Sequence, residues 1–337
     1  MHHLLRLIAA TAITTVTIAL FSGVQQAASE PPSWMGMDRV SSVAMWERHA
    51  KIEENWSPPA WYPQETQTQL WAIDEMDDQV GSVGPDLGLR SKGAFVFDVD
   101  TGNVLLAQGA DERRAVASLT KMVSALTMVS EDPDLDKEHC LDESIRPSWP
   151  GAITRLPRNT CTTGWDLLGA ALVRSDNGAA FAFASVAQMD NFHFVDRMND
   201  VARDLGMSNS TFADPTGVAD ENMSTPRDMT KAILAAALHP QVGVVTNAPY
   251  WDLTDSRDGE ARRFHSTNTL RRKKGINVEF LAAKTGYTDT ALHCYSAVVR
   301  TRAGRTFAMT FMGAKRSKWR WDDARKVVRW VERLEAG

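Results

Sequence analysis

The hydrophobic pattern after residue 90 alternates between strand and helix signals. Residues 94–99 (AFVFDV) and 104–107 are rich in aromatic and aliphatic residues around the turn sequence Asp-Thr-Gly-Asn, which predicts a β-hairpin. From Ser118 to Val129 apolar residues recur at helical spacing, so Ser118 lies at or near a helix N-terminus. The same reasoning predicts further helices over 167–173, 179–189, 194–205, 228–238 and 321–334, and strands over 277–283, 295–301 and 306–312.

This order of elements predicts an α+β fold. Strands occur at both ends of the region and helices lie between them, so the outer segments are expected to share one sheet. The helices of roughly 133–240 would form an inserted lobe. The cleft between the sheet and this lobe is then the natural place for a binding or active site.

Two segments precede the folded region, which we place at 91–337. Residues 1–28 are predicted to be a signal peptide, since an uncharged, mostly apolar stretch follows Arg6 and ends at Ala27 and Ala28. An uncleaved membrane anchor is the alternative, and both interpretations place the rest of the chain outside the cytoplasm. Residues 29–90 hold five of the eleven tryptophans and many prolines. They are interpreted as an extension or linker that either packs on the main domain or contacts a partner.

The composition narrows the class of protein. Of the 337 residues, 43% are hydrophobic and 23% are charged, which excludes a wholly disordered chain and a multi-pass membrane protein. The net charge of −5 and the lack of a long basic run argue against a nucleic-acid partner. Three cysteines are too few for a disulfide-dense scaffold, and the chain has no Cys-x-x-Cys or His-Glu-x-x-His motif.

Three short motifs carry candidate chemistry. The first is Ser118-Leu-Thr-Lys121, which at a helix start puts the serine and the lysine one turn apart, so that a neutral lysine can activate the hydroxyl. The second is Ser175-Asp-Asn177, after a helical pattern, where a simple helix cap is the alternative. The third is Lys284-Thr-Gly286 in a strand pattern, where the alternative is an edge strand with a solubilising lysine.

Together, in this order, the motifs resemble the signature of penicillin-binding proteins and serine β-lactamases. Residues 91–337 further resemble the D-alanyl-D-alanine carboxypeptidase/endopeptidase family, notably in Thr211–Gly217 (TFADPTG) and Ser224–Thr230 (STPRDMT). The closest likeness is to its D-alanyl-D-alanine endopeptidase (penicillin-binding protein 7) branch. Asp228-Met-Thr-Lys231 and the His293-Cys294 pair suggest this branch, and the 337 − 286 = 51 residues after Gly286 leave no room for the C-terminal domain of many carboxypeptidases.

The resemblance implies a serine β-lactamase/DD-peptidase-like fold, with an antiparallel sheet flanked by helices and the active site in the cleft beside the inserted lobe. It implies an acyl-enzyme mechanism with Ser118 as nucleophile and Lys121 as base, kept neutral by other positive charge that includes Lys284. Ser175 would relay the proton to the leaving amine. The residues expected to bind substrate are Asn177, Lys284, Thr285 and Gly286, and the backbone N–H groups of Ser118 and Tyr287 would form the oxyanion hole.

The expected substrates are peptidoglycan stem peptides, with β-lactams as covalent inhibitors and with no metal or organic cofactor. Residues 30–90 would then be a possible contact to the membrane or to a wall complex. The alternatives are a D-alanyl-D-alanine carboxypeptidase, a class A-like β-lactamase and a non-catalytic wall-binding protein. The β-lactamase is disfavoured because no Glu-x-x-Leu-Asn motif follows Asn177. Ala282 and Gly178 depart from the residues common in the family, and both could shift the substrate preference.

The cysteines allow one disulfide. Cys140 and Cys161 flank a segment between two motif-bearing helices, and in an oxidising compartment they could close a loop of about 20 residues. Two separate thiols are the alternative. Cys294 is interpreted as a buried strand cysteine rather than a nucleophile.

Overall fold

The computed structural model describes residues 83–141 and 154–336. The predicted signal peptide (1–28) and residues 29–82 of the predicted extension lie outside the described residues. Among the helices of the described ranges, none combines the length and the apolar character needed to cross a membrane.

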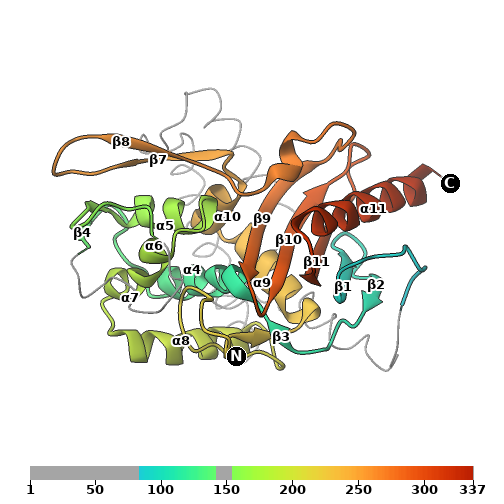
Figure 1. Cartoon of the computed structure of the whole chain (residues 1–337), viewed down its shortest axis with the longest axis horizontal. Coiled ribbons are helices and arrows are strands. Elements are labelled where there is room, and N and C mark those ends of the chain that lie inside the picture. Colours follow the sequence, from blue (N-terminus) through green and yellow to red (C-terminus); the bar gives the residue numbers. More distant parts are fainter. Residues whose placement is uncertain (1–82, 142–153, 337) are drawn as a thin grey trace, which may run out of the picture. The chain divides into compact units, whose positions relative to one another are not determined.

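The main sheet combines strands from the two ends of the described chain. Its five antiparallel strands have the order β2-β1-β11-β10-β9. Their bounds are β1 Gly93–Asp98, β2 Val104–Gln108, β9 Glu279–Thr288, β10 Leu292–Arg300 and β11 Thr306–Ala314. Figure 1 shows the blue-green strands β1 and β2 beside the orange to red strands β9 to β11. The expectation that the outer segments share one sheet is therefore confirmed, with Phe95 of β1 paired to Thr310 of β11.

Each face of the sheet is covered by a helix. α11 (Ser317–Ala336) packs its apolar stripe, including Val327 and Val331, on alternate residues of the central strands. On the other set of alternate residues lies α9 (Pro226–Leu238), where the hydroxyl of Thr230 donates to that of Thr310 at 2.8 Å. The strands β1 and β11 are buried throughout, which explains their continuous hydrophobic runs. The helix α9, predicted within the inserted lobe, thus lies directly against the sheet.

The remaining elements form the part of the fold that faces β9. The helices are α4 (Thr120–Ser130), α5 (Gly164–Val173), α6 (Asn177–Phe181), α7 (Phe183–Val186), α8 (Asn191–Asp204) and α10 (Pro240–Asn247), with the 3-10 turns η2 (Ala117–Leu119) and η3 (Thr269–Arg272). Three small antiparallel sheets pair β3 (Arg114–Ala115) with β6 (Met223–Ser224), β4 (Glu138–Cys140) with β5 (Cys161–Thr163), and β7 (Tyr250–Thr254) with β8 (Ala261–His265). The central helix α4 is buried along its length except at its last residue, Ser130, and neighbouring helices surround it.

The β7–β8 hairpin is an element that the hydrophobic pattern did not predict. In β8 only Phe264 is buried, and two arginines precede it, so the segment lacks the alternation typical of a half-buried strand. Val83, the first described residue, already pairs with Ala107, eight residues before the predicted boundary at 91. The backbone N–H of Ser91 then donates to the carboxylate of Asp323 in α11 at 2.7 Å.

Candidate active site

Ser118 lies in the short turn η2 that leads into α4. The preceding residue, Ala117, has φ +49°, a left-handed conformation that is unfavourable for a residue with a Cβ and is often found at functional sites. The hydroxyl of Thr120 donates to the Ala117 carbonyl at 2.8 Å and closes this turn. One turn into the helix, the Nζ atom of Lys121 donates to Ser118 Oγ at 3.1 Å. The S-x-x-K spacing thus places a buried amine against the candidate nucleophile.

Lys121 is fully buried, and three neutral oxygens accept hydrogen bonds from it. Besides Ser118, its Nζ atom donates to Asn177 Oδ1 at 2.7 Å and to the Thr216 carbonyl at 2.5 Å. Burial lowers the pKa of Lys121 from 10.5 to about 7, because the ammonium form loses its hydration. The carboxylates of Asp214 and Asp176 act in the opposite direction and raise this pKa. A large neutral fraction is therefore present near pH 7, as a general base requires.

The sequence analysis expected Lys284 to depress the pKa of Lys121, and the structure gives a different main cause. Burial is the largest effect on the pKa of Lys121, and the carboxylates of Asp214 and Asp176 partly oppose it. The pKa of Lys284 is lowered first by burial and then by the charges of Lys121 and Arg320. Desolvation is therefore the largest cause of the lowered pKa of the candidate base.

The loop at 214–217 is part of the site, although the sequence analysis gave its residues no role. The carboxylate of Asp214 accepts hydrogen bonds from the backbone N–H groups of Thr216 (2.5 Å), Gly217 (3.0 Å) and Ala219 (2.8 Å), which fold the loop so that the Thr216 carbonyl meets Lys121. Gly217 has φ +85°, and a Cβ there would overlap the Ala117 carbonyl. The loop must therefore pass directly against the turn that carries Ser118.

The second motif lies between α5 and α6. Ser175 has φ +65°, and Asp176 is the N-cap of α6, with its Oδ1 accepting the Ala179 N–H at 3.1 Å. Asp176 therefore acts as the helix cap, while its two neighbours contact the lysines, and their functional roles stay a prediction. Ser175 Oγ accepts from Lys284 and Asn177 Oδ1 accepts from Lys121, each at 2.7 Å.

The third motif lies in β9, an edge strand of the main sheet. Lys284 is 1% exposed, so it is not a solubilising lysine of an edge strand. Its Nζ atom donates to Ser175 Oγ at 2.7 Å and to the Thr285 carbonyl at 2.9 Å. Gly286 allows β9 to approach η2, since a Cβ there would lie 2.9 Å from the Val116 carbonyl oxygen. The glycine thus brings the third motif to the nucleophile.

Two further side chains, those of Thr267 and Arg320, support β9, and neither was assigned a role from the sequence. The hydroxyl of Thr285 donates to that of Thr267 at 2.8 Å. Nη1 of Arg320, from the first turns of α11, donates to the carbonyls of Gly286 at 3.0 Å and Cys294 at 3.1 Å. Burial lowers the pKa of Arg320 to about 10, so it stays a cation and adds positive charge beside Lys284. These roles are not visible in the sequence, because each residue acts on β9 through contacts that only folding creates.

Tyr287 follows the third motif, and its side chain is 53% exposed. Its ring stacks on His293 of β10 at 4.4 Å between centroids, and its hydroxyl donates to Asp289 at 2.7 Å. The predicted oxyanion hole uses only its backbone N–H together with that of Ser118, and this assignment stays a prediction.

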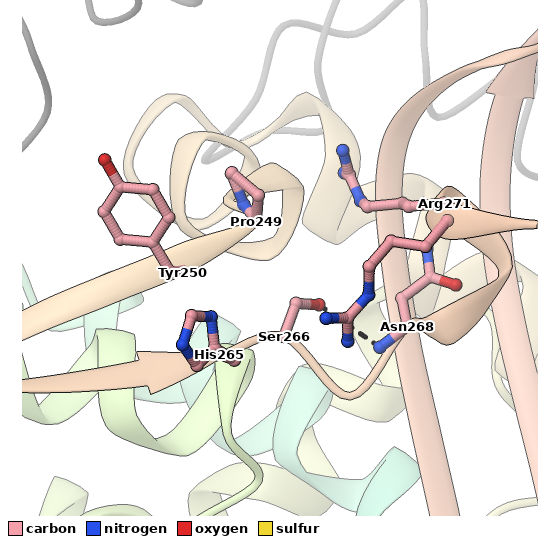
Figure 2. A pocket seen from close by; sticks show the side chains of 7 residues that line it. Pro249, Tyr250, His265, Ser266, Asn268 and Arg271 are labelled. Atoms are coloured by element: carbon pink, nitrogen blue, oxygen red, sulfur yellow. Dashed lines mark hydrogen bonds between the residues drawn. The ribbon is translucent and has the colours of Figure 1, made fainter.

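A cavity of about 190 Å³ adjoins the site at the base of the β7–β8 hairpin. Its lining residues are Pro249, Tyr250, His265, Ser266, Asn268, Arg271 and Arg272. Figure 2 shows Tyr250 and His265 on the strands of the hairpin, with Asn268 and Arg271 on the side of the main sheet. None of the predicted site residues lines this cavity, and it is smaller than the roughly 300–1,000 Å³ of a usual ligand pocket. Thr267, which contacts Thr285, lies in the chain between two of the lining residues, Ser266 and Asn268.

The cysteines are arranged as one disulfide and one buried thiol. Cys140 and Cys161 are joined in a disulfide between β4 and β5. Glu138 lies close to the two sulfurs, but disulfide sulfurs do not offer the thiolates that a metal ion would need. Cys294 is fully buried in β10, and burial raises the pKa of its thiol to about 11, so it stays protonated and is a poor nucleophile.

Comparison with known proteins identifies the family. The sequence model of peptidase S11, described as D-alanyl-D-alanine carboxypeptidase, matches residues 80–316. This chain belongs to peptidase S11. The D-alanyl-D-alanine endopeptidases of Escherichia coli and Pseudomonas aeruginosa are each 30% identical over 245 residues, which cover 72% of this chain and 78% of theirs. A D-alanyl-D-alanine carboxypeptidase of Bacillus subtilis is also 30% identical, over 74% of this chain and 64% of its own length.

Solved structures show the same fold for this S11 peptidase. The Streptomyces K15 DD-transpeptidase superposes with a TM-score of 0.65 at 23% identity, covering 74% of this chain and 98% of its own. A penicillin-binding protein homologue from Mycobacterium tuberculosis gives a TM-score of 0.65 at 22% identity, covering 77% and 95%. The predicted fold class and family are therefore confirmed, and the chain is a serine-type hydrolase of the D-alanyl-D-alanine peptidases.

Proposed function

We propose that this S11 peptidase is a cross-link endopeptidase, which cleaves D-Ala–D-Xaa bonds between peptidoglycan stem peptides through an acyl-enzyme. The observation that carries the chemistry is the pair of buried lysines, Lys121 on Ser118 and Lys284 on Ser175, held in one site. The endopeptidase branch is favoured because two relatives with that name combine 30% identity with coverage of 78% of their length. The Bacillus carboxypeptidase is 30% identical over 64% of its length, and a Streptomyces carboxypeptidase is matched over 86% of its length at 25% identity.

The first chemical step forms the acyl-enzyme. Neutral Lys121 takes the proton of the Ser118 hydroxyl, and the Ser118 Oγ atom forms a bond to the carbonyl carbon of the penultimate D-alanine. The carbon–nitrogen bond then breaks, and the leaving amine receives a proton through the Ser175 hydroxyl. Water subsequently attacks the ester, which releases the shortened stem peptide and restores the hydroxyl of Ser118.

Binding is assigned to the groups around this centre. The ammonium of Lys284 and the hydroxyl of Thr285 would hold the carboxylate on the leaving side, with the backbone of β9 alongside. Asn177 would hold a substrate amide, although in the free protein its oxygen accepts from Lys121. The N–H groups of Ser118 and Tyr287 would stabilise the oxyanion, a contribution of about 2.7–4 kcal/mol per donor in serine hydrolases. The same geometry would accept β-lactams as covalent inhibitors.

The compartment and the extension belong to the proposal as well. A site for wall peptides requires export, for which the sequence of residues 1–28 is suited. Residues 29–90 would carry a contact to the membrane or a wall complex. A non-catalytic wall-binding role is disfavoured, because the candidate nucleophile Ser118 is hydrogen-bonded to Lys121 and the candidate relay residue Ser175 is hydrogen-bonded to Lys284.

The test is a digest of purified muropeptides that contains both cross-linked dimers and uncross-linked pentapeptides, read by mass spectrometry, with the Ser118→Ala protein as control. Conversion of dimers to monomers by the wild type alone would support the endopeptidase. Loss of only the terminal D-alanine would make the protein a carboxypeptidase. Equal product from the Ser118→Ala protein would overturn the assignment of the nucleophile.

A further inference from the structure

Asp176 sits between the two functional residues of the second motif and is fully buried. Its neighbour Ser175 contacts Lys284, and its other neighbour, Asn177, contacts Lys121. A buried carboxylate needs hydrogen-bond donors. Donors that hold the Asp176 carboxylate in one orientation also fix the positions of the adjoining residues, Ser175 and Asn177. The origin of these donors therefore decides what positions the motif.

Two of the donors to Asp176 come from a separate segment about twenty residues earlier in the chain. The hydroxyl of Thr154 donates to Oδ1 at 2.8 Å, and the backbone N–H of Arg155 donates to Oδ2 at 2.5 Å. The third donor is the N–H of Ala179, which belongs to the cap of α6. Leu156, the next residue of the segment, is 4% exposed and fixes the segment to the domain. Both carboxylate oxygens are thus held from outside the motif.

Gly178 gives independent evidence that the side chain of Thr154 packs closely against the second motif. A Cβ at this position would lie 2.5 Å from the Thr154 Oγ1 atom and 2.8 Å from the Thr154 Cβ atom. Gly178 lies in α6 and is not among the glycines with positive φ, so space rather than backbone conformation explains its lack of a side chain. The side chain of Thr154 fills this space and cannot be displaced easily.

Ser175 adds a reason why such support is needed. Ser175 is not a glycine, yet its φ is +65°. This left-handed backbone conformation costs on the order of 1–3 kcal/mol and persists only where the surrounding structure enforces it. We propose that Thr154, together with the Arg155 backbone N–H, is a positioning residue for Ser175 and Asn177, acting through Asp176. This inference rests on the proposed roles of Ser175 and Asn177 in acylation.

The test compares Thr154→Val with a matched control, Thr162→Val. Thr162 also donates a hydroxyl to a mostly buried carboxylate, that of Asp166 at 3.0 Å, but in β5 and away from the motif. Each hydroxyl has a second partner, since Thr162 Oγ1 lies 2.8 Å from the Thr254 carbonyl and Thr154 Oγ1 accepts the Leu156 N–H at 3.2 Å. Both variants thus lose a hydroxyl with two polar partners, so both should lower the melting temperature by a similar amount. Displacements of about 1 Å can cost on the order of 100-fold in rate, so we expect acylation by a fluorescent penicillin at saturation to slow at least tenfold in Thr154→Val. The Thr162→Val protein should stay within twofold of the wild type.

Two further variants test the positioning role of Thr154 independently. Thr154→Ser retains the hydroxyl and should restore most of the saturating rate. Gly178→Ala places a methyl group against Thr154 and should slow acylation with all hydroxyls intact. A Thr154→Val protein that is acylated as fast as the wild type would overturn the inference, and so would equal slowing in Thr162→Val. If the wild type itself takes no label, the proposed function fails instead, and the two failures are thereby distinguished.

Discussion

The Nζ atom of Lys284 donates a 2.7 Å hydrogen bond to the hydroxyl of Ser175, across 109 residues of sequence. This contact joins the second motif to the third, and it pairs a buried lysine with a partly buried serine. The pKa of Lys284 is lowered by burial and by the neighbouring charges of Lys121 and Arg320. The bond holds the Ser175 hydroxyl beside Lys284, as the proposed proton relay requires.

Removal of the relay hydroxyl should slow acylation more than it affects folding. General acid–base groups contribute about 10²–10⁴-fold, so we expect Ser175→Ala to reduce the rate of penicillin acylation by roughly 100-fold or more. Stopped-flow or gel-based labelling gives the rate. The control is Ser296→Ala, which removes a buried hydroxyl paired with Thr310 at 2.7 Å in the main sheet. If the two variants are acylated at equal rates, Ser175 has no part in the relay.

The rate of acylation should rise with pH through about 7. The pKa of Lys121 is lowered from 10.5 to about 7, and only its neutral form can accept the proton of Ser118. Below pH 7 the rate should therefore fall up to tenfold per unit as the ammonium form becomes dominant, and above it the rise should level off. Labelling rates between pH 5 and 9, with folding followed by tryptophan fluorescence, provide the measurement. A flat profile across this range in folded protein would exclude Lys121 as the base.

Crowding at Gly217 can be separated from its backbone strain. Gly217 and Gly304 both have positive φ, but a Cβ at Gly217 would overlap the Ala117 carbonyl, whereas a Cβ at Gly304 meets nothing within 4 Å. Gly304→Ala should therefore cost only the left-handed strain, about 1–2 kcal/mol, with normal acylation. Gly217→Ala should cost more and also lose acylation, because the turn with Ser118 must move. Urea unfolding and labelling of both variants test this, and equal effects would contradict a role for close approach.

The disulfide should contribute to stability without being part of the chemistry. Cys140 and Cys161 are 21 residues apart, and closing a loop of this size stabilises a fold by about 3 kcal/mol in the chain-entropy model. A Cys140→Ser, Cys161→Ser double variant should lose about that much in urea unfolding, and reductant should have no further effect on it. If the double variant is as stable as the wild type, the loop is held without the disulfide.

Cys294 should stay unreactive to thiol reagents in the folded protein, since it is buried.

Element types followed well from the hydrophobic pattern where a segment is buried on one or both faces. The strands β1, β10 and β11 and the helices α4 and α11 were expected near their observed bounds, since apolar periodicity survives in them. A strand was expected over 277–283, with the third motif also in a strand pattern, and β9 runs without a break from Glu279 to Thr288. Lys284 and Gly286 have little strand propensity, and β9 continues through them because β10 supplies the partner for pairing.

The three motifs and their order were sufficient to indicate the family, and they supplied the residues proposed as nucleophile, base and relay, because such side-chain chemistry is visible directly in a sequence. The groups that tune them became visible only in the folded chain. The Thr216 carbonyl at Lys121, the Arg320 guanidinium beneath β9 and the Thr154 hydroxyl on Asp176 come from segments about 20 to 95 residues away from the groups they contact. A backbone carbonyl carries no residue-type signal, and the pKa of a lysine depends on burial, which only packing decides.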